Sequence, residues 1–118
     1  MIVRKHKNER MSKIVEHNGI VYLAGIVPDD TTLDVAGQTK RVLEIAEQRL
    51  AEANSDAEHI LRAEIYVKNI ARDFAEFNAV WDGWVSNENP PARACVEANM
   101  SSENTLVEII LTAVSKAN

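Results

Sequence analysis

Near its C-terminus the chain carries the stretch Thr105-Leu106-Val107-Glu108-Ile109-Ile110-Leu111-Thr112-Ala113-Val114. Apolar side chains occupy both alternating sets of positions, with Val107, Ile109 and Leu111 on one set and Leu106, Ile110 and Val114 on the other. A strand with two apolar faces is typical of the centre of a sheet that is covered on both sides. One acid, Glu108, interrupts the run where the local pattern asks for no charge. We therefore predict a central strand over 105–114 and treat Glu108 as a candidate functional residue.

The remaining strands are predicted upstream of this one. Asn18-Gly19 suits the positive φ angles of a type I′ turn, so residues 13–17 and 20–25 are expected to form a hairpin. Residues 2–6 add an edge strand before it. Residues 59–68 alternate apolar and polar side chains, as a half-buried strand does. A further strand is predicted over 92–98.

Two stretches show helical periodicity. The segment 28–32 supplies N-cap candidates for a long amphipathic helix over 33–53, whose apolar positions are Leu33, Ala36, Val42, Leu43, Ile45, Ala46 and Leu50. Phe74, Phe77, Trp81 and Trp84 follow at spacings of 3, 4 and 3, which is one stripe of a second helix. The two tryptophans would suit stacking on a ligand, but the stripe spacing favours a place in the core.

This order of elements predicts a single α+β domain over residues 1–118, with a mixed six-stranded sheet and two helices on one face. The opposite face, to which Leu106 and Ile110 are expected to point, then needs another cover. Since no third helix is available, a second subunit is the simplest cover. We therefore expect an oligomer.

Composition argues against several classes of function. No apolar run approaches the roughly 20 residues that cross a bilayer, and residues 1–10 lack a signal-peptide core. One cysteine cannot form an internal disulfide, so we expect a cytoplasmic protein. The net charge of -5 makes nucleic acid an unlikely partner, and we interpret the basic segment as a charged edge strand: Arg4, Lys5, Lys7, Arg10 and Lys13. The histidines are too scattered to indicate a metal site.

A group of reactive side chains falls on the strand 92–98. Arg93, Cys95 and Glu97 alternate with other residues and therefore share one face. If the last two strands form a hairpin that turns near residues 100 and 101, Arg93 lies opposite Glu108 and Cys95 faces Leu106. We adopt this register as an expectation.

This group has more than one interpretation. Arg93 suits the bidentate binding of a substrate carboxylate, with Glu108 orienting it or positioning a water, but an ion pair that fixes register between strands or subunits fits the pattern equally well. Cys95 is a candidate nucleophile without a nearby histidine, and a small buried apolar role is favoured for it. Asn78 borders the apolar stripe of the second helix, at a site, a subunit contact or a plain helix edge.

The blocks Pro91-Ala92-Arg93-Ala94-Cys95-Val96-Glu97 and Leu106-Val107-Glu108-Ile109 resemble the C-terminal signature of the Rid family, the YjgF-type reactive intermediate deaminases. The resemblance runs over nearly the full length. Further matching blocks are Val21-Tyr22-Leu23-Ala24-Gly25, Gln38-Thr39, Ile65-Tyr66-Val67-Lys68 and Asp73-Phe74-Ala75-Glu76-Phe77-Asn78.

The resemblance implies a chorismate-mutase-like fold and a homotrimer whose sheets line a central barrel, with ligand clefts between subunits. It also implies hydrolysis of 2-imino or enamine acids to 2-oxo acids and ammonia, without a metal or organic cofactor. On that model Arg93 binds the substrate carboxylate, Glu108 is the acid of the cleft, and Cys95 and Asn78 are further cleft residues.

Two positions depart from the family pattern. Many deaminating members carry a tyrosine in the N-terminal segment and a serine before the glycine, where this chain has Met11 and Ala24. The chain therefore resembles a divergent subgroup of the family more than its best-described deaminases. A second hypothesis is a binding protein for small carboxylates such as 2-oxo acids, without turnover. Ribonuclease or translation-inhibitor activity, a label that some members carry, is the least favoured because the chain is acidic and lacks a His-based acid/base pair on one element.

Overall fold

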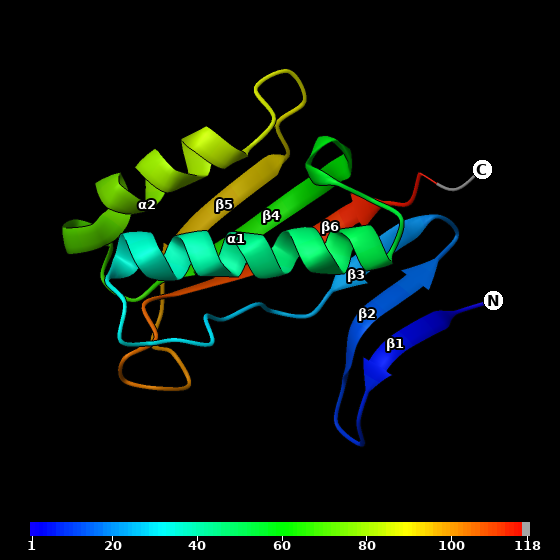
Figure 1. Ribbon diagram of the computed structural model, residues 1–118, viewed down its shortest axis with the longest axis horizontal. Coiled ribbons are helices and arrows are strands. Elements are labelled where there is room, and N and C mark those ends of the chain that lie inside the picture. Colours follow the sequence, from blue (N-terminus) through cyan, green and yellow to red (C-terminus); the bar gives the residue numbers. More distant parts are fainter. Residues whose placement is uncertain (117–118) are drawn as a thin grey trace.

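Six strands and two long helices make up the computed structural model, which describes residues 1–116 (Figure 1). The helices are α1 (Val35–Glu52) and α2 (Ile70–Trp84), and a short 3-10 turn, η1, covers Ala57–His59. The sheet has the order β1-β2-β3-β6-β4-β5, which places β1 and β5 at its edges. The strands are β1 (Val3–Lys7), β2 (Ser12–His17), β3 (Ile20–Leu23), β4 (Ile60–Val67), β5 (Ala92–Glu97) and β6 (Val107–Val114).

The apolar stretch forms the central strand that its pattern predicts. β6 lies between β3 and β4 and is antiparallel to both. Val107, Ile109, Leu111 and Ala113 are fully buried on one of its faces. The other face carries Glu108, Ile110, Thr112 and Val114, which are half-buried.

The N-terminal hairpin also matches its sequence signal. Asn18 and Gly19 both adopt positive φ angles, of 52° and 80°, and join β2 to β3. Positive φ at both central residues defines the type I′ turn, whose twist suits the flanking strands. β1 pairs with β2 and is the charged edge strand that the basic N-terminal segment predicts.

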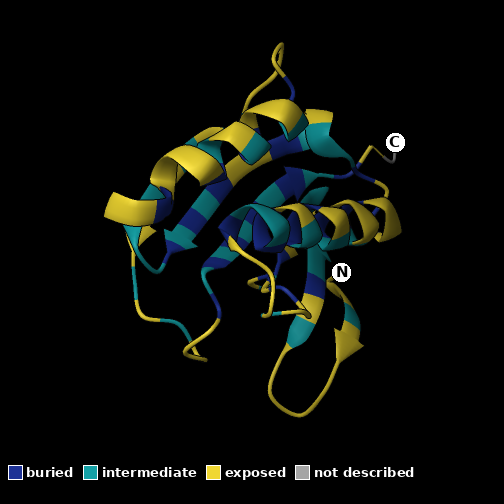
Figure 2. Ribbon diagram, turned by 60° about the vertical axis from the view of Figure 1, so that its left-hand side comes forward, coloured by how far each residue is buried: buried dark blue, intermediate teal, exposed yellow. Residues whose placement is uncertain are grey.

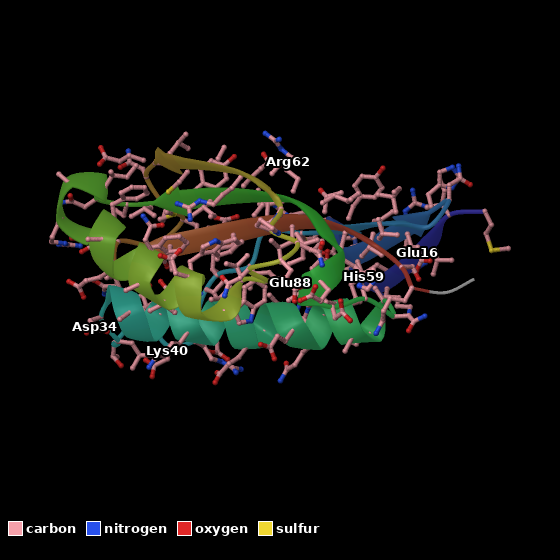
Figure 3. All side chains as sticks on the ribbon, turned by 90° about the horizontal axis from the view of Figure 1, so that it is seen from above. Glu16, Asp34, Lys40, His59, Arg62 and Glu88 are labelled. Atoms are coloured by element: carbon pink, nitrogen blue, oxygen red, sulfur yellow. The ribbon has the colours of Figure 1, made fainter. Side chains whose placement is uncertain are left out.

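Both helices cover the same face of the sheet, as expected. Figure 3 shows them on one side of the sheet, with Arg62 on the other side and Lys40 projecting from α1 away from the sheet. Asp34 caps α1 by accepting a hydrogen bond from the Gly37 N–H at 2.9 Å. The expected N-cap within residues 28–32 is therefore wrong, because the capping side chain is Asp34, and α1 begins two residues after the approximate predicted start at Leu33.

The expected hairpin of the last two strands is wrong. β5 runs parallel to β4, and β6 is antiparallel to β4 on its other side, so β4 separates β5 from β6. Arg93 pairs with Ala63 and Glu108 pairs with Tyr66. Cys95 pairs with Ile65 and does not face Leu106. The physical reason is α2, since a helix between two strands favours a parallel crossover, which leaves the centre of the sheet to β6.

Among residues 1–116, no helix or further strand covers the face of the sheet opposite the helices. Its residues include Tyr22 and Val96, which are 49% and 48% exposed, and the half-buried Ile20, Ile110 and Val114. Figure 2 shows buried and half-buried residues alternating along the central strands, as expected when only one face is packed within the chain. Large apolar side chains on an open sheet face favour burial against another molecule.

Gln38 fixes the segment that leads into β6. Its buried side chain donates hydrogen bonds to the carbonyls of Leu33, at 3.1 Å, and Asn104, at 2.9 Å. Its Oε1 accepts from the Leu106 N–H at 2.8 Å. Both the amide nitrogen and the amide oxygen of this buried side chain are therefore hydrogen-bonded. These bonds hold the start of β6 against α1.

Over residues 1–116 no helix combines the length and the apolar character needed to cross a membrane.

Candidate functional site

Arg93 lies on the edge strand β5 and points toward α2. Its guanidinium lies 5.9, 5.7 and 5.6 Å from the ring centroids of Phe74, Phe77 and Trp81. One terminal nitrogen donates a hydrogen bond to Asn78 Oδ1 at 2.8 Å. These four α2 residues are spaced as neighbours on one helix face, so the helix holds the cation through cation–π contacts and one hydrogen bond.

The guanidinium has no carboxylate partner among residues 1–116. Arg93 is half-buried, and its one side-chain hydrogen bond is the one to Asn78. Its remaining N–H donors form the planar fork that binds carboxylates in a bidentate manner. The side chain is therefore held in place and available to an anionic ligand.

Cys95 and Glu97 share the face of Arg93, as predicted, but they have different surroundings. Cys95 packs against the core, and burial raises the pKa of its thiol above the ordinary value, against the opposing effect of the nearby Arg93 charge. Glu97 is exposed and accepts a hydrogen bond from the Ile70 N–H at 3.0 Å, at the start of α2. Cys95 is thus a neutral, small side chain beside the arginine, and Glu97 stabilises a helix N-terminus.

Glu108 lies on the opposite face of the sheet from Arg93. Residues that pair across a sheet share a face, so Glu108 lies with Tyr66, whereas Arg93 lies with the buried Ala63. Glu108 packs instead on Gly25, where a Cβ would overlap its Oε2 and lie 3.0 Å from its carboxyl carbon. Gly25 is therefore a position where a close approach requires the absence of a side chain.

Met11 and Ala24 lie together in one hollow with Gly25. The hollow has a volume of about 340 Å³ and is enclosed by residues around β2, the segment after β3 and one side of α1. Met11 and Ala24, which stand where many family members have a tyrosine and a serine, thus line one space, and Gly25 of the Glu108 contact lines it too. Both present hydrocarbon there in place of a hydroxyl group.

The structure therefore divides the predicted site residues into two groups. Arg93, Asn78 and Cys95 lie together between β5 and α2, and Glu108 lies apart from them with Gly25. The sequence did not point to the three rings around Arg93 or to the Glu108–Gly25 contact. The stripe spacing of the aromatic residues was the available signal, since Asn78 falls four residues after Phe74 and three before Trp81, on the same helix face.

In the part of the chain that the structure describes, no group of three His, Cys, Asp or Glu side chains is placed to hold a metal ion.

Comparison with known proteins decides the family. The family model described as "Endoribonuclease L-PSP" matches residues 3–115. The chain belongs to this family, which includes the YjgF and Rid proteins. A RutC family protein of Haemophilus ducreyi is 42% identical over 96% of this chain and 96% of its own length. The RutC family protein YoaB of Escherichia coli is 34% identical over 95% of this chain and 96% of its own.

Solved structures of the family share the fold. A YjgF-family protein from Neisseria meningitidis superposes with a TM-score of 0.95 at 41% identity, covering 100% of this chain and 98% of that one. A YjgF/YER057c/UK114 family member from Mycobacterium tuberculosis gives 0.81 at 25% identity, covering 97% and 98%. The prediction of an α+β fold with a mixed six-stranded sheet and two helices on one face is confirmed.

Proposed function

We propose that the protein hydrolyses reactive 2-imino acids to 2-oxo acids and ammonia. Water adds its oxygen to the imine carbon, and one water proton passes to the imine nitrogen to give a carbinolamine. The carbinolamine then passes its hydroxyl proton to the nitrogen, and the C=O bond forms as the C–N bond breaks and ammonia leaves. The products are one 2-oxo acid and one ammonia for each imine and water consumed. Family membership supports this reaction class, and no metal or organic cofactor enters it.

One observation carries the proposal: the Arg93 guanidinium is held by α2 and has no acidic partner in residues 1–116. It binds the substrate carboxylate through its free donors. The imine carbon, which is attached to that carboxylate, is thereby fixed in position for attack.

Glu108 supplies the acid of the site from a second copy of the chain. Within one chain β4 and the thickness of the sheet separate Glu108 from Arg93, so one chain does not bring both to one ligand. A homotrimer brings the edge strand β5 of one subunit toward the Gly25–Glu108 region of the next. There the carboxylate accepts a proton from the attacking water and returns it to the leaving nitrogen.

Imine decay tests this function directly. An amino-acid oxidase generates the imine, and semicarbazide captures what remains. The wild-type protein is expected to accelerate the decay, and Arg93→Ala to lose most of the effect, since loss of a charged hydrogen-bonded contact costs about 2–5 kcal/mol. Arg93→Lys keeps the charge but lacks the fork, so it should stay well below wild type. No acceleration over buffer with several amino acids would rule the function out.

A second candidate is reversible binding of 2-oxo acids without turnover. The hydrocarbon side chains of Met11 and Ala24 beside the Glu108 contact favour it, because they leave fewer polar groups to orient a water. Saturable binding of a 2-oxo acid without imine hydrolysis would select this function.

We also expect a cytoplasmic protein that acts without a membrane or nucleic acid partner. Ribonuclease activity, which the name of the family model suggests, remains the least favoured, because the net charge is -5 and none of the proposed site residues is a histidine.

A further inference from the structure

The hollow beside Gly25 concentrates positive charge in an acidic protein. It carries Lys13 from β2 and Arg41 and Arg49 from α1, against a single acid, Asp29. The whole chain has a net charge of -5, so this surplus of cations is a local feature. A cleft lined by one sign of charge attracts ligands of the opposite sign.

Two of these cations remain free to bind a ligand. Arg41 is occupied, because its Nε and one terminal nitrogen donate to the two carboxylate oxygens of Asp29, both at 2.8 Å. That pair neutralises the one acid of the hollow and holds the pKa of Asp29 below its usual value. Lys13 has no side-chain partner in the described residues. The two free cations are thus Lys13 and Arg49.

Arg49 has only a weak acidic contact. Its side chain is 22% exposed, and its one ion pair, with Glu52, is 3.6 Å long. The carboxylate of Glu52 is shared with His6 Nε2 at 2.5 Å, which is the closer partner. A long contact to a shared acid leaves most of the hydrogen-bonding capacity of Arg49 unused.

The hollow also has the size and place of a substrate subsite. Its volume of about 340 Å³ lies at the small end of ligand pockets, which suits a short metabolite. Its wall includes Gly25, the residue on which the Glu108 carboxylate packs. Glu108 is not itself among the lining residues, and Gly25 is the residue that the hollow and the Glu108 contact share. We take a substrate whose reacting carbon lies beside Glu108 to extend its side chain past Gly25 into the hollow.

From these contacts we propose that Lys13 and Arg49 bind a second anionic group on the substrate, so the preferred substrates are short dicarboxylic 2-imino acids. This inference rests on the proposed function, because it takes the first carboxylate to bind Arg93. It assigns the two cations a role in specificity. The reaction itself needs neither of them.

A matched pair of product analogues tests the preference. 2-Oxoglutarate and 2-oxopentanoate have the same carbon chain, and only the first carries the terminal carboxylate. By calorimetry at low ionic strength, we expect wild-type protein to bind 2-oxoglutarate about tenfold more tightly than 2-oxopentanoate. The double variant Lys13→Gln/Arg49→Gln should lose this difference and keep its affinity for 2-oxopentanoate.

Lys40→Gln is the matched control, because Lys40 is an exposed cation of α1 that projects away from the sheet (Figure 3). It should leave both affinities unchanged. Equal affinities in the wild type, or a preference that survives the double variant, would overturn the inference. If both acids bind equally and depend on Arg93, only the inference fails. If neither acid binds, the proposed function fails with it.

Discussion

Arg93 and Glu108 occupy opposite faces of one sheet, on strands that β4 separates. Arg93 reaches α2, where Asn78 accepts its hydrogen bond at 2.8 Å, whereas the Glu108 carboxylate packs on Gly25. A ligand bound by one of these side chains in a given chain is out of reach of the other. The two residues therefore act together only if two copies of the chain meet.

The Gly25–Glu108 contact predicts a selective effect of Gly25→Ala. The new Cβ would overlap Glu108 Oε2, so the carboxylate must move and turnover should fall while the fold persists. Gly83→Ala is the matched control, since nothing lies within 4 Å of its added Cβ. Gly83 lies in the last turn of α2, so that exchange should raise the free energy of unfolding by less than the about 0.5–1 kcal/mol of a helix interior, and it should leave turnover intact. Imine decay measures the turnover of each variant, and denaturant unfolding measures its stability. Equal turnover of the two variants would contradict a role for the Gly25–Glu108 contact in activity.

The free guanidinium of Arg93 predicts that an added acid inhibits the protein. Asn78→Asp places a carboxylate where Asn78 Oδ1 now accepts from Arg93. Such a carboxylate would pair with the guanidinium and compete with the ligand, so affinity for 2-oxopentanoate should fall about tenfold or more. Calorimetric titration measures this loss.

Asn78→Ala serves as the comparison, because it removes the hydrogen bond without adding a charge. Its loss of affinity should be smaller than that of Asn78→Asp. The reverse order would show that Asn78 acts directly on the ligand rather than through Arg93.

The raised pKa of the Cys95 thiol predicts an unreactive side chain. Burial shifts it upward from 9.0, so the thiol is protonated at neutral pH and is a poor nucleophile. Alkylation by iodoacetamide should be slow at pH 7 and accelerate only above pH 9, and Cys95→Ala should keep most of the activity. Mass spectrometry follows the alkylation. Rapid modification at pH 7 that abolishes turnover would instead assign Cys95 a chemical role.

The sequence predicted those parts of the fold that local patterns determine. Asn18-Gly19 specified its turn, and the two apolar faces of 105–114 specified the centre of the sheet. The partner of β5 is set by the path of α2, which no residue of β5 encodes, so the predicted hairpin failed. The Arg93–Asn78 pair joins a strand to a helix fifteen residues earlier, and alternation along one strand does not reveal such a contact.

Mixing two inactive variants tests the shared site most directly. In the proposed homotrimer, the Arg93→Ala and Glu108→Gln variants should each lack activity, because every site misses one residue. When equal amounts of the two are refolded together, each site has a one-half chance of an intact Arg93 from one copy and a one-half chance of an intact Glu108 from the next. About a quarter of the sites then contain both residues, so the mixture should recover about a quarter of wild-type turnover. A mixture that stays as inactive as the separate variants would contradict a site shared between two copies of the chain.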